Sequence, residues 1–207
     1  RALYQDFLGR APSATELKAR TAALGAGVLN RGALVRELAN SNEWVLGIVQ
    51  GLYKDTLGRP GDPAGAAYWT ARIRSHRSSV AAAAATFYAS DEYFAGTGGG
   101  SVKTWITDLF AKILHRSPDA AGLQAWEQIA QRDGRPSVAL GLYQSKECRV
   151  NRVAALYRSL LGRGPDAAGT AYWAARVEGL GDLSLAASLA VSDEYLTRAK
   201  VRFPTAA

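Results

Sequence analysis

The sequence predicts an all-α protein of four tandem, degenerate repeats with about three helices each, 11–12 helices in total and no β-sheet. Two short motifs that each occur four times support this prediction. The first is Leu-Gly-Arg, in which His115 once replaces the glycine, with an aromatic residue six places before the arginine; the motif arginines are Arg10, Arg59, Arg116 and Arg163. The second is Ser-x-Glu, and the motif glutamates are Glu43, Glu92, Glu147 and Glu194. No segment of useful length alternates apolar and polar residues with the period of a strand.

The spacing of the motif arginines sets the domain organisation. Successive motif arginines are 49, 57 and 47 residues apart, as expected for an internal repeat. The extra length of the second interval surrounds a glycine-rich run at residues 96–101. We therefore predict repeats one and two in residues 1–95, an insertion at 96–101, and repeats three and four in 102–207, within one continuous helical domain.

The first helix of each repeat is expected to begin at a capping side chain shortly after the motif arginine. The predicted caps are Ser13, Asp62, Asp119 and Asp166. Ser13 and Glu16 have the spacing of a capping box. In repeats two to four a glycine stands four residues before a tryptophan, so both share one helical face and the glycine can admit a close neighbour. Repeat one lacks this pair and is interpreted as a degenerate capping repeat.

The second and third helices follow from apolar spacing and capping. A second helix, for example over residues 80–89, carries two apolar positions four residues apart, which predict a buried stripe at Leu34 and Leu38, Ala83 and Phe87, Val138 and Leu142, and Leu185 and Leu189. The serine of Ser-x-Glu is expected to cap a third helix, such as one over residues 42–57. Gly58 is expected to end that helix in the left-handed conformation, which explains the Leu-Gly-Arg motif.

The recurring arginine and glutamate are predicted to have a structural role. We predict that the motif arginines fold back onto helix-terminal carbonyls or onto the motif glutamates, in partly buried ion pairs that act as a structural clamp. The alternative is that both residue types are solvated at helix ends and contribute little energy.

Five aromatic residues form a candidate ligand or partner surface: Tyr68, Trp69, Trp126, Tyr172 and Trp173. Adjacent residues on a helix point about 100° apart, so only one of each Tyr-Trp pair can face the core centrally. The simpler interpretation buries the tryptophan and leaves the tyrosine at the rim. The alternative places the outer aromatics in a groove where a sugar ring or a partner helix stacks.

The composition narrows the possible partners. The 207 residues are 48% hydrophobic, enough for a sizeable core, and the net charge of +7 is spread without a run of like charges. The sequence therefore argues against nucleic-acid binding, and no membrane span or signal peptide is predicted. The chain has no methionine and starts at Arg1 within a motif, so we expect a fragment of a longer protein.

No catalytic pattern is found in the sequence. His76 and His115 lie in different repeats and are expected at the surface, and the lone Cys148 is expected to be a small core residue. No cofactor, metal site or catalytic residue is predicted. The carboxylates are numerous enough to leave a glycosidase pair open.

The second and fourth repeats carry the motifs most fully, from Leu52-Tyr53 through Tyr68-Trp69 to Tyr93, and from Leu156-Tyr157 through Tyr172-Trp173 to Tyr195. In this order the motifs resemble the bacterial family catalogued as domain of unknown function 4214, which is more distantly similar to phycobilisome linker domains. Its members are commonly pieces of large exported or surface-bound proteins, including adhesins with calcium-binding repeats. The resemblance implies a helical, non-catalytic module outside the cytoplasm, and it supplies no ligand.

The expected function is therefore a non-catalytic helical module of a larger exported or surface protein that mediates protein–protein interaction, assembly or adhesion. Its partners would be neighbouring domains of the parent protein, other proteins or surface glycans. The alternative is a module that binds glycans or cell-wall polysaccharide, and a weaker alternative is an enzyme of unrecognised type.

Overall fold

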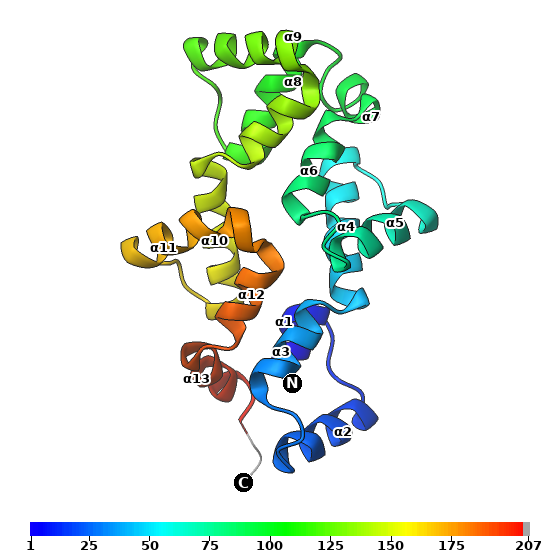
Figure 1. The fold of residues 1–207 in the computed structure, drawn as a ribbon, viewed down its shortest axis with the longest axis vertical. Helices are drawn as coiled ribbons and strands as arrows, with labels where there is room; N and C mark the ends of the chain where they lie inside the picture. The colour runs from blue at the N-terminus through cyan, green and yellow to red at the C-terminus, as the bar shows by residue number, and fades with distance from the viewer. Residues whose placement is uncertain (205–207) are drawn as a thin grey trace. The chain divides into compact units, whose positions relative to one another are not determined.

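The structure, a computed structural model, describes residues 1–204, which form α-helices α1 to α13 and one short π-helical turn, η1 (Figure 1). Within that range there is no β-strand, which confirms the all-α prediction. The helices are α1 (Ala2–Leu8), α2 (Ala14–Gly25), α3 (Arg31–Ala39), α4 (Asn42–Leu57), α5 (Pro63–Arg74), α6 (Val80–Ala89), α7 (Asp91–Ala95), α8 (Val102–Leu109), η1 (Phe110–Leu114), α9 (Ala120–Tyr143), α10 (Lys146–Leu161), α11 (Ala167–Leu180), α12 (Asp182–Ala190) and α13 (Asp193–Arg202). No helix in residues 1–204 combines the length and apolar character that crossing a membrane requires.

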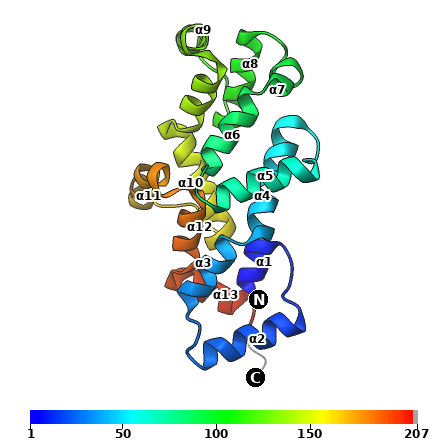
Figure 2. The same ribbon diagram turned by 45° about the vertical axis from the view of Figure 1, so that its right-hand side comes forward.

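The chain folds into two compact units. Unit 1 contains Arg1–Gly47 and the described residues from Val153 onward, and unit 2 contains Ile48–Arg152. In unit 1, α3 packs on α1 and α12; in unit 2, α9 packs on α6 and α8 (Figure 2). The first and last predicted repeats thus share a unit, while the division at residues 96–101 stays a prediction.

The predicted apolar stripe is buried in both units. Its eight side chains are all at most 6% exposed: Leu34, Leu38, Ala83, Phe87, Val138, Leu142, Leu185 and Leu189. Most of these belong to one of the two core clusters, one in each unit. The second helix of each predicted repeat therefore supplies the centre of a core, because its two stripe positions lie one turn apart on the same face.

The predicted caps are present. Ser13 and Glu16 form a complete capping box, and the Asp62, Asp119 and Asp166 carboxylates each accept a hydrogen bond from the N–H three residues later, at 2.6–2.9 Å. The serines of Ser-x-Glu accept in the same way at 3.1–3.2 Å, at Ser41, Ser90, Ser145 and Ser192. Each capping oxygen satisfies one amide that the helix itself leaves without a partner.

Two helical segments differ from the predicted pattern of three helices per repeat. α9 contains a non-helical residue, Gly134, with φ of 79°, so it consists of two helical stretches on either side of a kink. The third helix of the second predicted repeat is divided by the glycine-rich run at residues 96–101 into α7 and α8. The predicted insertion therefore interrupts a helix.

The Leu-Gly-Arg motif ends helices in the left-handed conformation, as predicted. Gly9, Gly58 and Gly162 have φ of 68°, 65° and 72°, and His115 occupies the fourth equivalent position with φ of 58°. A residue with a Cβ is less stable in this conformation than glycine.

Tyrosines that precede the motif arginines pack against the start of the next helix. A Cβ added at Gly65 would clash with the Tyr53 hydroxyl oxygen, and one added at Gly169 would lie 3.0 Å from the Tyr157 hydroxyl oxygen. The glycine that precedes each Tyr-Trp pair thus admits the tyrosine of the preceding helix, the kind of close neighbour that the glycine–tryptophan spacing suggests.

We expect His115→Gly to raise the free energy of unfolding by about 0.5–1 kcal/mol, because the left-handed strain is removed and only part of the gain is lost to the entropy of glycine. Urea denaturation measures the change. His115→Ala is the control, since it removes the imidazole and keeps the Cβ. Equal stability of the two variants would contradict the strain argument.

We expect Gly65→Ala to lower the free energy of unfolding by about 1–3 kcal/mol, because the new methyl group displaces the Tyr53 side chain from a packed position. Gly51→Ala in α4 is the matched control, because an added Cβ there meets no atom within 4 Å. That control should be neutral or stabilising, since alanine favours a helix more than glycine does. Thermal unfolding of both variants measures their stability. A similar loss of stability in the two variants would refute the packing explanation.

Candidate functional site

Each motif arginine forms a two-bond ion pair with the motif glutamate that follows it in the sequence. Nε donates to one carboxylate oxygen and Nη2 to the other, at distances of 2.5–2.9 Å in all four cases. The pairs are Arg10–Glu43, Arg59–Glu92, Arg116–Glu147 and Arg163–Glu194. This parallel geometry is the strongest arrangement available to the two groups.

The same guanidinium makes two further contacts. Its Nη1 donates to the carbonyl oxygen of the next residue, at 2.9–3.3 Å, at Ala11, Pro60, Ser117 and Gly164. It also lies 5.1–5.6 Å from the centroid of the aromatic ring six residues earlier, at Tyr4, Tyr53, Phe110 and Tyr157. Each motif arginine thus joins the end of one helix, the loop after it and the beginning of a later helix.

The ion pairs are half-exposed, since the side chains of all eight residues are 40–51% accessible. The hydrogen bonds from arginine lower the pKa of Glu43, Glu92, Glu147 and Glu194 below the ordinary value of 4.5. Glu16 also pairs with Arg10, and that bond, together with the Ser13 amide, lowers its pKa to about 2. Water screens pairs at this exposure, so the energetic value of the clamp stays a prediction.

The Tyr-Trp pairs form two matched surfaces, which we call the Tyr-Trp-Arg faces. On α5 of unit 2, Tyr68 is 55% exposed and its ring meets that of Trp69 edge to face at 5.3 Å. On α11 of unit 1, Tyr172 is 49% exposed and meets Trp173 in the same manner at 4.9 Å. Both tryptophans are half-buried, so the tyrosines are the outer members of the pairs.

An arginine four residues after each tyrosine completes the face. The Cζ of Arg72 is 5.5 Å from the Tyr68 ring centroid, and that of Arg176 is 3.6 Å from the Tyr172 ring centroid. The motif analysis does not single out these arginines. Their spacing of four residues from an exposed tyrosine on a helix is a signal that could have found them.

Trp126 on α9 belongs to a different environment. Its ring packs against the core of unit 2, and a Cβ added at Gly141 would lie 2.9 Å from it. Ala125 stands where the other pairs have tyrosine. Within residues 1–204, Trp126 makes no ring contact with Tyr68 or Trp69. The five predicted surface aromatics therefore form two separate pairs, Tyr68–Trp69 and Tyr172–Trp173, and Trp126 belongs to neither.

A buried carboxylate not anticipated from the sequence lies in unit 1. The side chain of Asp6 is 8% exposed and accepts hydrogen bonds from the Tyr195 hydroxyl at 2.7 Å and from both Nη atoms of Arg202 at 2.7 and 2.8 Å. In unit 2 the Tyr93 hydroxyl donates to Asp108. Burial, followed by the bond to the aspartate, raises the pKa of both tyrosines. These tyrosines follow Ser-x-Glu, but their aspartates have no motif that sequence reasoning could use.

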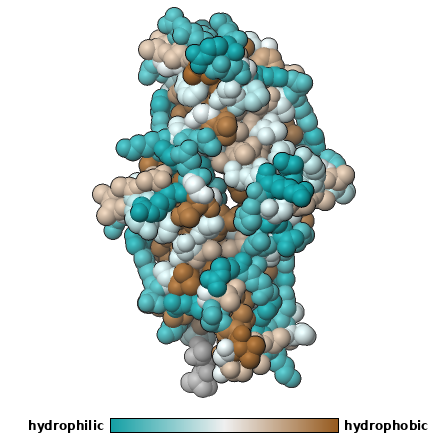
Figure 3. Space-filling view, viewed as in Figure 1, coloured by the Kyte–Doolittle hydropathy of each residue, from teal (hydrophilic) through white to brown (hydrophobic). Residues whose placement is uncertain are grey.

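The remaining predicted residues are placed as follows. His76 and His115 are exposed, and Cys148 is buried in the core of unit 2. Among residues 1–204, no group of three or more His, Cys, Asp or Glu side chains is arranged to hold a metal ion. The face drawn in Figure 3 is largely teal and white, with brown areas that are small and scattered.

Comparison with known families gives a match over part of the chain. Residues 84–152 match the model described as Domain of unknown function (DUF4214), which confirms the family resemblance. The matched segment runs from α6 into α10 and includes Ser90 and Ser145, so it spans one interval between successive Ser-x-Glu motifs. No curated protein and no solved structure matches the chain.

We expect the fold to lose stability as the pH falls below about 4.5, because the motif glutamates bind protons less readily when folded than when unfolded. A group with a lowered folded pKa stabilises the fold above its unfolded pKa, and that contribution disappears as the pH falls through the folded value. The urea concentration at the midpoint of unfolding should therefore fall less between pH 5 and about 2 in Glu92→Gln than in the parent chain. Glu127→Gln is the control, because Glu127 forms no ion pair within residues 1–204. The same acid response in Glu92→Gln and the parent would contradict the assignment.

Proposed function

We propose that this chain, in which residues 84–152 match DUF4214, is a non-catalytic helical module that mediates protein–protein contacts in a larger exported or surface protein. The observation that supports the proposal is the pair of exposed Tyr-Trp-Arg faces on α5 and α11. Export and surface location rest on the family resemblance.

The chemistry of the faces suits a protein partner. Tyrosine, tryptophan and arginine are enriched among the few residues that dominate the binding energy of protein interfaces. In each face the half-buried tryptophan supports the tyrosine from one side, and the arginine lies against its ring. Side chains held in this way lose less conformational entropy on binding than free ones.

The motif carboxylates support a non-catalytic role. Each of the four motif glutamates accepts two hydrogen bonds from an arginine. A general acid needs a raised pKa, whereas these pairs lower the pKa of the glutamates. They are therefore poorly suited to the acid role in a glycosidase pair.

The glycan alternative is less favoured by the geometry of Tyr172. A sugar ring stacks on an open aromatic face. The Arg176 guanidinium, 3.6 Å from the ring centroid, covers one face of Tyr172. A protein partner can contact the 49% exposed Tyr172 together with Arg176 without displacing the arginine, so we favour protein contacts.

We expect the chain to associate with further copies of itself through these faces, and the double variant Tyr68→Ala/Tyr172→Ala to weaken that association by about tenfold or more. Sedimentation velocity over a range of concentrations measures the effect. Leu180→Ala on α11 is the control, because Leu180 is a 48% exposed apolar residue outside the faces.

A glycan array probed with the same samples tests the alternative. Saturable sugar binding that Tyr172→Ala abolishes, by a chain that stays monomeric, would overturn the protein-interaction proposal in favour of a glycan-binding module. Association that ignores every sugar and depends on the two tyrosines is the result expected here.

A further inference from the structure

Each unit has a groove between two packed helices. In unit 2 it has a volume of about 470 Å³ between α6 and the part of α9 that follows the kink, and in unit 1 about 240 Å³ between α12 and α3. We call these surfaces the inter-helix grooves. Counted from the motif serine, four lining positions on α6 coincide with four on α12: Ala82 and Ser184, Ala85 and Ala187, Thr86 and Ser188, and Ala89 and Val191. All eight side chains are short, so each groove has room for a larger side chain from another molecule.

An exposed aspartate follows the α6 and α12 walls of the grooves. Asp91 lines the groove of unit 2, and Asp193 is its counterpart in unit 1, one residue after the motif serine. Their side chains are 94% and 92% exposed, and one oxygen of each carboxylate accepts a hydrogen bond, from Arg135 or from Arg31. Within residues 1–204 the second oxygen of each carboxylate has no hydrogen bond, so it can accept one from a further cation.

The same two repeats supply these aspartates and the Tyr-Trp-Arg faces. The second repeat has Tyr68, Arg72 and Asp91, and the fourth has Tyr172, Arg176 and Asp193. The first and third repeats have none of the three residue types at the matched positions, which are occupied by Ala19, Ala23 and Asn42, and by Ala125, Ile129 and Lys146. The face and the carboxylate thus occur together, as expected if one recognises the other.

The dimensions of a face suit a groove. The tyrosine and the arginine of a face are four residues apart, so they lie on one side of the helix and about 6 Å apart along its axis. In unit 2 the groove follows α6 from Ala82 to Ala89, about 10 Å of helix, and Asp91 comes directly after it. The groove is therefore long enough to receive the tyrosine while the arginine reaches the aspartate.

The arginines of the faces are available for such a contact. Within residues 1–204, Arg72 and Arg176 donate only to backbone carbonyl oxygens, those of Arg77 and Tyr172, and form no ion pair. A guanidinium has five N–H donors in one plane, so an arginine that lies against a tyrosine ring keeps donors for a carboxylate.

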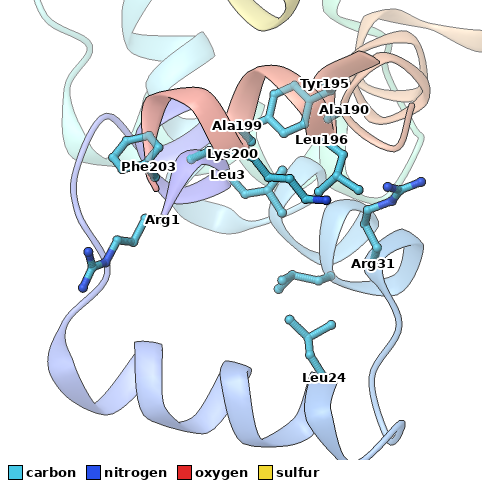
Figure 4. Close-up of a pocket in the computed structure, with 12 residues that line it drawn as sticks. Arg1, Leu3, Leu24, Arg31, Ala190, Tyr195, Leu196, Ala199, Lys200 and Phe203 are labelled. Carbon is cyan, nitrogen blue, oxygen red and sulfur yellow. The ribbon is translucent and has the colours of Figure 1, made fainter. Parts of the chain in front are cut away.

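Unit 1 also has a largely apolar pocket of about 390 Å³ between α13, α1, α2 and α3 (Figure 4). Its charged lining residues are Arg1, Arg31 and Lys200, and no carboxylate side chain of residues 1–204 lines it. An incoming face would bring its arginine against like charge there. The inter-helix grooves, with Asp91 and Asp193, are therefore the better acceptors for the faces.

We infer that each Tyr-Trp-Arg face docks into an inter-helix groove of a second copy of this chain. The tyrosine enters between the two helices, and the arginine donates to the oxygen of Asp91 or Asp193 that has no bond within its own unit. The inference rests on the proposed function and identifies the surface that receives the faces. Because face and groove are different surfaces, the contact is heterologous, and one copy can offer a face to one neighbour and a groove to another.

The double variant Thr86→Lys/Ser188→Lys tests the grooves. A lysine at either lining position occupies the groove with its stem and sets a cation against the incoming arginine. Self-association measured by sedimentation velocity should weaken by about tenfold or more. Thr107→Lys/Thr197→Lys is the matched control, because it adds the same charge at exposed threonines that do not line the grooves and whose hydroxyls also bond to the carbonyl oxygen four residues earlier. The control should associate like the parent chain.

Mixing two variants distinguishes a face-to-groove contact from a face-to-face contact. Tyr68→Ala/Tyr172→Ala keeps its grooves, and Thr86→Lys/Ser188→Lys keeps its faces. Each should associate weakly alone, whereas a mixture in which one of them carries a fluorescent label should form a mixed complex in sedimentation velocity. If the faces instead bound one another, the groove variant alone would associate like the parent chain, and that result would overturn the inference.

Asp91→Asn/Asp193→Asn tests the carboxylates without added bulk. Asparagine keeps the shape and one oxygen for Arg135 or Arg31 but lacks the charge, so association should weaken severalfold and should respond less to added salt than in the parent chain. Circular dichroism shows whether each variant is folded. Folded groove and aspartate variants that both associate like the parent chain would refute the grooves as acceptors.

The outcomes separate this inference from the proposed function. A parent chain that associates through its tyrosines, with groove variants that associate equally well, would count against the grooves alone. A parent chain that stays monomeric at every concentration would overturn the self-association expected under the proposed function and the acceptor surface with it.

Discussion

The ion pair between a motif arginine and the next motif glutamate is the contact that recurs in both units and joins the end of one helix to the start of a later one. It connects residues 31–33 positions apart and does so with two parallel hydrogen bonds. The left-handed residue before the arginine turns the chain at the end of a helix, so the guanidinium lies both over an aromatic ring of that helix and against the glutamate. A solvent-exposed pair is weak by itself. Here its geometry is supported by a ring contact, a carbonyl bond and a helix cap at once.

Close packing between successive helices depends on small residues at particular places. Gly65 and Gly169 leave room for the tyrosine hydroxyls of the preceding helices, and Gly98 leaves room for the Trp105 indole. These contacts explain why the motifs combine glycine with large aromatic residues at fixed spacing. A large ring can pack close to a helix backbone only where the facing residue lacks a side chain.

The two units share some side-chain contacts and differ in others. Both have a motif tyrosine bonded to an aspartate and an Arg–Asp pair near it. Unit 2 includes the fully buried Trp105 of α8 in its core, whereas unit 1 has a largely apolar pocket lined by residues of α1, α2, α3 and α13. Because the motif charges are engaged in caps and ion pairs, the proposed function rests on the exposed tyrosines with their arginines.

Local features of the sequence determined the helix starts at Asp62 and Ser90, the left-handed end at Gly58, the buried stripe and the outward position of Tyr68. Each depends on residues within about four positions of one another, where the periodicity of a helix relates sequence to space directly. The acceptor for each motif arginine was open between a carbonyl and a glutamate, and the structure shows that the guanidinium bonds to both. Tertiary structure alone decided that Asp6 accepts a hydrogen bond from Tyr195, 189 residues away, that the first and last segments share a unit, and that Trp105 is fully buried. Such contacts arise from the packing of helices distant in sequence, and no local spacing encodes which side chains will then meet.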